Sequence, residues 1–235
     1  MSDPPATGTS APSGRDSFLL IAGIAGLLTQ VAGIVVNVVL LAPPPDPPGL
    51  DSPIGELAAY GAAKSSELAL GHGIRFFAQI LLLIFGIGLY RLVRGREDGP
   101  HRGWATLGLM ATLWVPAIGL VANSIEGVLV WQAGGLTEQP QLALALWGIS
   151  NFLWNATAVP FSVMVLGFSL AGRGSGAFPG WLVLLGLAAA GGGLGGAFLT
   201  ALREPHGADV PVEAFLLLLL PWVIITSIRM IRLRR

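Results

Sequence analysis

The chain alternates between long apolar stretches and short segments rich in Pro, Gly and charged residues. Six stretches are apolar over at least the roughly 20 residues that a helix needs to cross a hydrocarbon core about 30 Å thick. Their approximate spans are 18–42, 67–90, 104–130, 142–170, 181–202 and 212–231. This pattern predicts an all-α integral membrane protein whose residues 18–235 form a six-transmembrane-helix bundle.

The N-terminal segment, residues 1–17, has no apolar run and is rich in Pro, Ser, Thr and Gly. Such a composition cannot bury enough surface to offset the entropy of ordering, so we expect a disordered cytoplasmic tail. The apolar stretch that follows, 18–42, is much longer than the 7–15-residue core of a secretory signal. We therefore interpret it as the first membrane span.

The segment between the first two spans, 43–56, is acidic and Pro-rich and cannot itself cross a membrane. Within it, Ser52 and Pro53 are typical of a helix start, because Pro is tolerated in the first helical turn. The sequence "IGELAAYGAAKSS" is therefore predicted to form a short helix that rests on the outer surface.

Basic residues are distributed unevenly among the segments that connect the spans. If the N-terminus is cytoplasmic, the cytoplasmic segments hold Arg15, Arg91, Arg94, Arg96, Arg102, Arg173, Arg229, Arg232, Arg234 and Arg235. The outer segments hold only Lys64 and Arg203, and Arg75 lies within a span. This positive-inside bias predicts that the N- and C-termini are both cytoplasmic.

The second span carries ionisable side chains on one face. Successive residues of a helix turn by about 100°, which places His72, Arg75 and Gln79 within an arc of about 60°, with Glu67 beside it. A charge buried in hydrocarbon costs about 2.5–3.5 kcal/mol on insertion scales, so this face is expected to point into the bundle.

Two neighbouring spans carry polar residues at a comparable depth. Asn123 and Glu126 lie on one face near the outer end of the third span, where they are candidate partners of His72 and Arg75. The upper part of the fourth span presents Trp147, Asn151, Trp154 and Asn155. The predicted polar site comprises Glu67, His72, Arg75, Gln79, Asn123, Glu126, Trp147 and Asn151.

Two interpretations of this polar site stay open at the level of sequence. In the first, Arg75 and Glu126 form a structural salt bridge, and the amide side chains make interhelical hydrogen bonds worth about 0.6 kcal/mol each. In the second, the site is functional, because ionisable groups inside a membrane commonly mark ligand or proton pathways. Arg75 would then hold an anionic group, and His72 would titrate near neutral pH.

Glycines and prolines within the spans predict close helix packing and kinks. The fifth span contains Gly191, Gly192, Gly195 and Gly196, whose four-residue spacing lets another helix approach closely. We predict that this face packs within the bundle, with a homo-oligomer contact as the alternative. Kinks are expected at Pro116, Pro160 and Pro221, because each frees a backbone carbonyl.

The amino-acid composition limits the partners, cofactors and activities that the sequence predicts. Among 235 residues, 53% are apolar and 11% are charged, and the net charge is zero, so nothing indicates a nucleic-acid partner. The chain has no cysteine, and His72 is the single histidine expected within the bilayer, so we predict no metal site and no cofactor. No serine, metal or cofactor motif supports catalysis, so we predict that the protein is not an enzyme.

Two stretches carry a family resemblance: "GHGIRFFAQILLLIFGIGLYRLVR" before a basic loop, and "SGAFPGWLVLLGLAAAGGGLGG" at the start of the fifth span. In these stretches, and in helix number and loop placement over residues 18–231, the chain resembles an uncharacterised bacterial membrane family, domain-of-unknown-function family 4386. The resemblance implies a compact helical protein of the bacterial inner membrane without an assigned activity. It transfers no functional residue.

The sequence as a whole predicts a multi-pass protein of a bacterial inner membrane. The scarcity of lysine, with Lys64 alone beside twelve arginines, suggests a high-GC bacterial genome. The leading functional hypothesis is a transporter-like or sensor-like module that binds a small polar or amphipathic ligand in an outward-facing cavity. The alternative is a structural or interaction subunit that contacts the lipid bilayer and a membrane-protein partner.

Overall fold

The computed structural model describes residues 17–41, 54–94, 102–131, 140–201 and 205–233. These residues form helices, and no strand occurs among them, which confirms the all-α prediction. Six segments are long and apolar enough to cross a membrane: Ser17–Leu40, Ser65–Arg94, Gly103–Leu129, Gln141–Gly174, Gly180–Leu199 and Phe215–Leu233. The predicted six-helix membrane bundle is confirmed, and the cytoplasmic placement of both termini stays a prediction.

The helices follow the order of the predicted spans, with one additional helix between the first two. Their bounds are α1 Ser17–Ile34 continuing into the π-helix η1 Val35–Leu41, α2 Ile54–Ala63, α3 Ser65–Arg94, α4 Arg102–Trp131, α6 Pro140–Ala156, α7 Ala158–Gly174, α8 Gly180–Ala201 and α9 Pro205–Leu233. Because α1 begins at Ser17, that residue does not belong to the predicted N-terminal tail. The rest of that tail lies outside the described residues.

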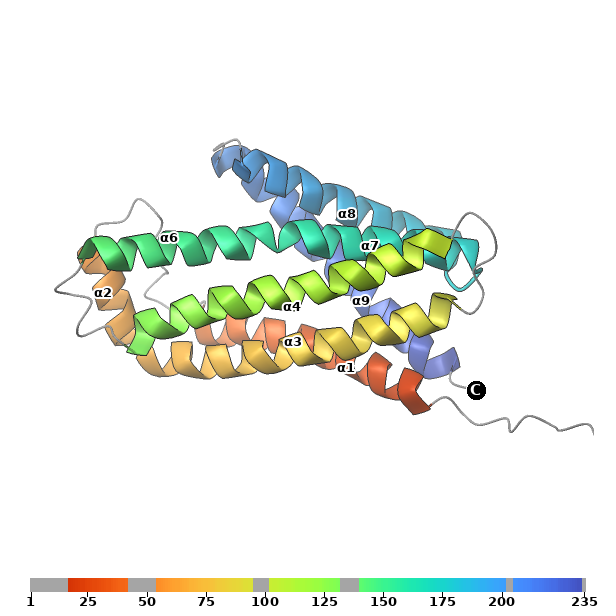
Figure 1. Cartoon of the computed structure of the whole chain (residues 1–235), viewed down its shortest axis with the longest axis horizontal. Coiled ribbons are helices and arrows are strands. Elements are labelled where there is room, and N and C mark those ends of the chain that lie inside the picture. The colour runs from red at the N-terminus through yellow and green to blue at the C-terminus, as the bar shows by residue number, and fades with distance from the viewer. Residues whose placement is uncertain (1–16, 42–53, 95–101, 132–139, 202–204, 234–235) are drawn as a thin grey trace, which may run out of the picture.

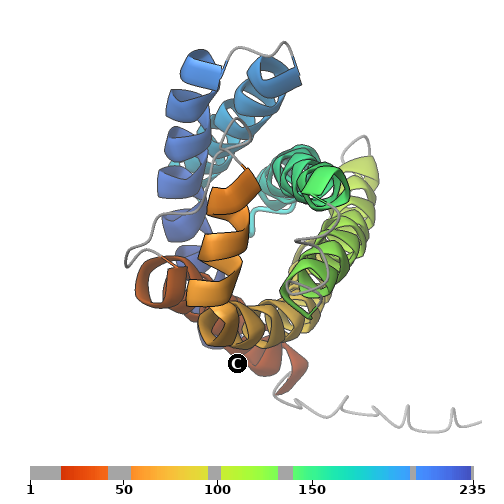
Figure 2. The same cartoon turned by 90° about the vertical axis from the view of Figure 1, so that its left-hand side faces the viewer.

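The spanning helices form a closed ring in which each packs beside its neighbour in the sequence, and α9 packs against α1 (Figures 1 and 2). One end of the ring, here called the α2 end, carries α2. The other, the terminal end, carries the start of α1 and the end of α9 (Figure 1). The predicted short helix is present as α2. It contacts α3, α4 and α6 and lies across the α2 end of the ring (Figure 2).

The fourth span is divided into two helices at Thr157. Pro160 has no N–H group, so the carbonyl of Ala156 lacks its usual helical partner, and α6 ends at Ala156. Thr157 bridges the break, because its hydroxyl donates to the Trp154 carbonyl at 2.5 Å and its own carbonyl accepts from Phe161 N at 3.1 Å. The other two prolines within spans leave α4 and α9 as continuous helices.

The half of the bundle next to the terminal end, here called the dry half, has a mainly apolar core. Its largest fully buried side chains include Phe85, Phe168 and Trp222, and Met230 packs among them. Glycines let the backbones meet there. A methyl group at Gly167 would lie 2.6 Å from the amide nitrogen of Gly108 on α4. Helices α4 and α7 are therefore in backbone contact.

The glycines of α8 pack differently from the prediction. A methyl group at Gly193 would lie 2.9 Å from the Phe215 ring on α9 and would overlap Ser162 on α7. Gly193 therefore makes a close approach, and Gly186 makes another against Ser169 and Trp222. Gly191 instead is exposed and has no atom within 4 Å of its potential side chain, so its predicted internal packing is wrong for the described chain. Among the other three predicted glycines, Gly196 is buried, and Gly192 and Gly195 are half-buried.

Candidate functional site

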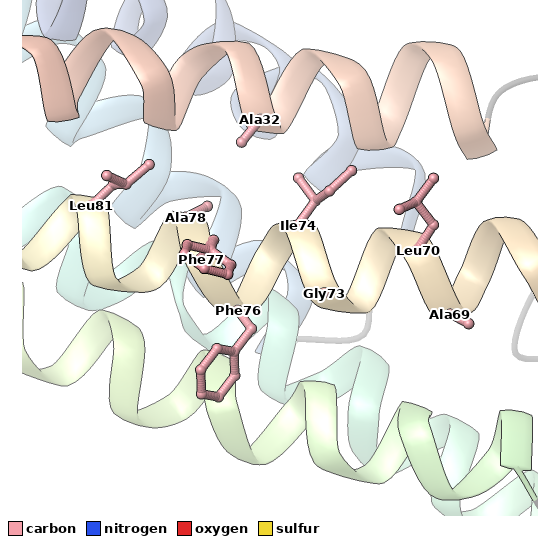
Figure 3. A pocket seen from close by; sticks show the side chains of 9 residues that line it. All are labelled: Ala32, Ala69, Leu70, Gly73, Ile74, Phe76, Phe77, Ala78 and Leu81. Carbon is pink, nitrogen blue, oxygen red and sulfur yellow. The ribbon is translucent and has the colours of Figure 1, made fainter.

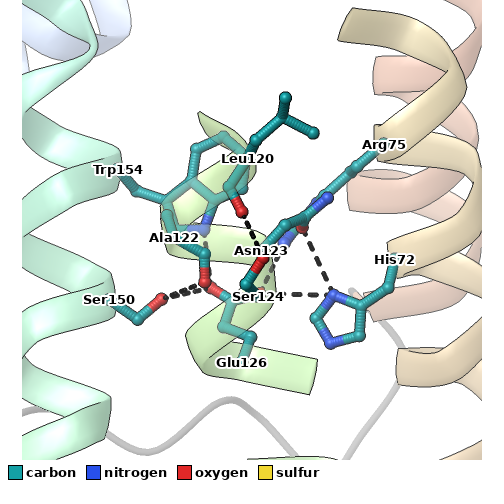
Figure 4. Close-up of polar contacts among 9 residues, drawn as sticks. All are labelled: His72, Arg75, Leu120, Ala122, Asn123, Ser124, Glu126, Ser150 and Trp154. Carbon is teal, nitrogen blue, oxygen red and sulfur yellow. Dashed lines mark hydrogen bonds and ion pairs between the residues drawn. The ribbon is translucent and has the colours of Figure 1, made fainter. Parts of the chain in front are cut away.

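The carboxylate of Glu126 is the centre of a polar cluster between α3, α4 and α6 (Figure 4). Glu126 is 8% exposed. Its Oε1 accepts hydrogen bonds from Ser150 Oγ at 2.9 Å and Trp154 Nε1 at 2.6 Å. Its Oε2 accepts from Arg75 Nη1 at 3.0 Å. Both carboxylate oxygens therefore have donors, as a buried charge requires.

Arg75 lies between the acid and an aromatic ring. Its guanidinium carbon is 5.1 Å from the centroid of the Trp154 ring, so the cation is stabilised by the ring as well as by Glu126. A guanidinium has five N–H donors in a fixed fork. Among the described residues, Nη1 alone makes a hydrogen bond, and the side chain is 22% exposed. Arg75 thus keeps unused donor capacity.

His72 lies on the other side of the carboxylate. Its Nδ1 is 3.3 Å from Asn123 Oδ1 and 3.7 Å from Glu126 Oε2. Both neighbours are oxygen acceptors, which assigns a proton to Nδ1. The opposite nitrogen, Nε2, is buried and has no hydrogen-bond partner in the described structure. In a neutral ring that nitrogen is an acceptor, and in an imidazolium it is a donor.

The antiparallel register of α3 and α4 brings these residues together. His72 lies opposite Glu126, Gln79 packs against Gly119, and Gly86 packs against Thr112. Each step moves seven residues along α3 and seven back along α4, which returns to the same face after two helical turns. The polar face predicted on the second span is therefore the face that meets α4.

Helix α6 completes the cluster from a third side. Ser150 and Trp154 are four residues apart and so lie on one face of the helix. Ser150 is fully buried, and its hydroxyl lies within reach of Glu126 and, at 3.4 Å, of the Ala122 carbonyl. The carboxylate, which α4 carries, is thus bound by side chains of two other helices, α3 and α6.

Four of the predicted site residues make no hydrogen bond with another residue of the cluster. Glu67 accepts from the neighbouring Ser66 hydroxyl at 3.2 Å, and Asn151 donates to the Trp147 carbonyl at 2.9 Å within its own helix. Trp147 Nε1 and Gln79 Oε1 are buried without partners among the described residues. The structure therefore joins His72, Arg75, Asn123 and Glu126, as expected, and leaves Glu67, Gln79, Trp147 and Asn151 around them.

Trp154 was named on the fourth span but left out of the predicted site, and two further residues of the site were not predicted from the sequence. Ser150 was missed because a serine in an apolar helix usually bonds its own backbone, although its four-residue spacing from Trp154 was a usable signal. Tyr60 on α2 is only 4% exposed. Burial raises the pKa of Tyr60 above 10.0, the positive charge of Arg75 opposes this shift, and Glu126 and Glu67 add to it. Helix α2 thus covers the polar cluster.

The described residues contain no group of three or more His, Cys, Asp or Glu side chains that could hold a metal ion. Comparison of the chain with family models, with curated proteins and with solved structures finds no match. The resemblance to domain-of-unknown-function family 4386 stays a prediction.

Proposed function

We propose that the protein binds a small polar ligand with an anionic group at the Arg75 side of this cluster. The ligand would enter from the α2 end, and the protein would act as a transporter-like or sensor-like module. No catalytic step belongs to this proposal. The orientation predicted by the arginines places the α2 end outside the cytoplasm of a bacterial inner membrane.

The observation that carries the proposal is the imbalance of hydrogen bonding within the cluster. Both oxygens of Glu126 have donors, whereas Arg75 uses one nitrogen and His72 Nε2 has no partner among the described residues. A salt bridge that served packing alone would be expected to satisfy the cation as fully as the acid, since unpartnered buried polar groups are costly. The unused donors are those that recognise carboxylates and other oxyanions.

Charge sets a condition on such a ligand. Arg75 and Glu126 form a neutral pair when His72 is uncharged, so a bound anion would add one net negative charge to a partly buried site. Either the carboxylate of Glu126 must give up part of its contact with Arg75, or a proton must enter with the ligand. His72 and Glu126 are the cluster residues that can carry this proton, which makes coupling between the ligand and a proton part of the proposal.

The alternative is a purely structural ion pair in a subunit that docks a membrane partner. One observation favours it: the carboxylate of Glu126 is already saturated by Arg75, Ser150 and Trp154. Buried charged networks of this kind specify helix register in some proteins without binding any ligand. The exposed Gly191 face of α8 would then serve as the contact with a partner or with a second copy of the chain.

Thermal unfolding of the purified protein with a panel of small anions distinguishes the two functions. The panel is formate, acetate, succinate, bicarbonate and phosphate. A ligand present at 100 times its dissociation constant stabilises the folded state by about 2.7 kcal/mol, which raises the unfolding temperature. The ligand-binding proposal expects at least one anion to stabilise the wild type and to lose this effect in Arg75→Gln.

The matched control is Arg232→Gln, which removes an exposed arginine from the terminal end of the bundle. This variant should keep the full anion response, because it leaves the cluster intact. If no anion stabilises the wild type, or if Arg232→Gln abolishes the response as Arg75→Gln does, the structural alternative holds.

A further inference from the structure

A second site lies along α3 on the outer surface of the ring, beside α1 (Figure 3). A hollow of about 490 Å³ is lined there by one residue of α1, Ala32, and by eight residues of α3 between Ala69 and Leu81. In the close-up, Leu70, Ile74 and Leu81 point toward α1, whereas Phe76 points toward α4 (Figure 3). Every lining side chain is apolar.

The hollow lies between two levels at which glycines bring α1 and α3 into close contact. At one level Gly88 packs against Ala22, and a side chain at Gly26 would lie against the Phe85 ring. At the other, Gly71 lies 3.5 Å from Val36, measured from its potential methyl group. Between these contacts the small side chain of Ala32 faces α3 and leaves the space open.

The dimensions of the hollow decide what can occupy it. It extends about 18 Å along α3, because twelve residues separate its ends and each rises about 1.5 Å. A volume of about 490 Å³ over that length corresponds to a mean cross-section of about 27 Å². A helix with its side chains is about 10–12 Å wide, or roughly 80–110 Å² in section, so a second helix could lie over the hollow but would not fit within it.

We propose that this groove holds one acyl chain of a membrane phospholipid from the leaflet at the α2 end. The groove lies in the first half of α3, and its length of about 18 Å is close to half of a hydrocarbon core about 30 Å thick. Water is excluded because an apolar cavity offers it no hydrogen bond. The chain is retained by close packing, since lipid tails are no less apolar than the groove itself.

This site is independent of the proposed anion site. Residues 72, 75 and 79 face α4, whereas Gly73 and Phe77 lie on the opposite side of α3, and Phe77 is 69% exposed. The groove therefore binds only the hydrocarbon chain, so the retained lipid should not depend on its headgroup.

Native mass spectrometry of the protein tests the proposal. The protein is reconstituted in vesicles of phosphatidylethanolamine and phosphatidylglycerol, extracted in mild detergent and washed. The wild type should retain one phospholipid per chain, drawn from both headgroups in proportion to their abundance. Gly73→Leu should lose it, because Gly73 is exposed, has open space around it and its new side chain would fill the groove.

The matched control is Gly191→Leu, which adds the same side chain at another exposed, unobstructed glycine on α8. It should keep the lipid. If Gly73→Leu does not fold, Ala69→Leu fills the same groove from one end. Equal lipid retention in the groove-filling variants and in the control variant would overturn the proposal. The proposal would also fail if light scattering showed a dimeric wild type and a monomeric Gly73→Leu variant, because a second copy of the chain would then occupy the groove.

Discussion

The two halves of the bundle are held together by different means. At the α2 end, α3, α4 and α6 meet around Glu126, whose contacts are polar and come from side chains. Toward the terminal end, α4 and α7 meet backbone to backbone at Gly108 and Gly167, beside the buried ring of Phe168. The polar half leaves hydrogen-bonding capacity unused at Arg75. The dry half also contains buried polar atoms without a partner among the described residues, for example at Ser169 and Trp222, but its helices are in direct backbone contact.

This difference indicates which half of the bundle can rearrange and which half is rigid. Side-chain contacts to a carboxylate can exchange one partner for another at modest cost, which a binding site requires. Backbone contacts at glycine have no such freedom, because any added atom must displace a whole helix. We infer that the dry half is the scaffold, and that ligand-dependent change, where it occurs, is confined to the α2 end.

The largest effect is expected from breaking the ion pair. Arg75→Ala leaves the Glu126 carboxylate buried without its cation, and removing one partner of a buried pair typically costs about 3–5 kcal/mol. The free energy of unfolding in detergent should fall by this amount. The double variant Arg75→Ala with Glu126→Gln should recover a large part of it, because no uncompensated charge remains. A double variant as unstable as the single one would show that charge is not what holds the polar half.

The next largest effect is expected in the dry half. Gly167→Leu places a side chain against the backbone of Gly108, where overpacking typically costs 1–3 kcal/mol and the rigid neighbour places this case at roughly 3 kcal/mol. Gly148→Leu on α6 is the matched control, since nothing lies within 4 Å of its potential side chain. Thermal unfolding should show a large loss for the first variant and little change for the second. Equal losses would contradict the contrast between the halves.

A smaller effect separates two tryptophans of the polar half. Trp154→Phe removes the donor to Glu126 Oε1, and a hydrogen bond to a charged group is worth about 1.5–3 kcal/mol. Trp147→Phe removes an indole N–H that is buried without a partner in the described structure, so its polar loss should be negligible. Both substitutions replace the indole by the same smaller phenyl ring. The difference in unfolding free energy between them therefore measures the hydrogen bond together with any change in the contact of the ring with Arg75. Equal losses in the two variants would show that Trp154 does not stabilise the cluster.

The sequence predicted the spans and the pairing of α3 with α4 because both depend on local pattern. Hydrophobic length located the six helices, and helical periodicity placed His72 and Arg75 on the face that meets Asn123 and Glu126. Ser150 and Tyr60 were missed because their roles depend on how α6 and α2 dock. That docking depends on side-chain fit between segments distant in the chain, which periodicity within one helix does not encode.

The kink predicted at Pro160 is present as a division of the helix at Thr157, because the hydrogen bond that Pro160 cannot make is on the preceding turn. The docking of neighbouring helices explains one error in the prediction. In α8 the four-residue glycine spacing predicted internal packing at Gly191, whereas close approaches are made by Gly186 and Gly193. Which face of an almost uniformly apolar helix turns inward is decided by its neighbours.

The smallest expected effect concerns the cover that α2 provides. Tyr60 and Tyr90 are the two tyrosines of the chain, so Tyr90→Phe leaves Tyr60 as the single one. Burial raises the pKa of Tyr60 above 10.0, and the nearby carboxylate of Glu126 contributes. Ultraviolet absorbance of tyrosinate should therefore appear at higher pH in the folded protein than in denaturant.

The sign of the linked stability follows from the direction of this shift. A raised pKa in the folded state means that the contribution of Tyr60 to stability is complete below pH 10.0 and is lost as pH rises through the folded pKa. Adding Glu126→Gln to the Tyr90→Phe protein removes one of the influences that raise the pKa, so the titration should move back toward 10.0. If Tyr60 titrated at the same pH in the folded protein and in denaturant, α2 would not cover the cluster. The polar half would then be accessible to solvent at the α2 end, unlike the core of the dry half.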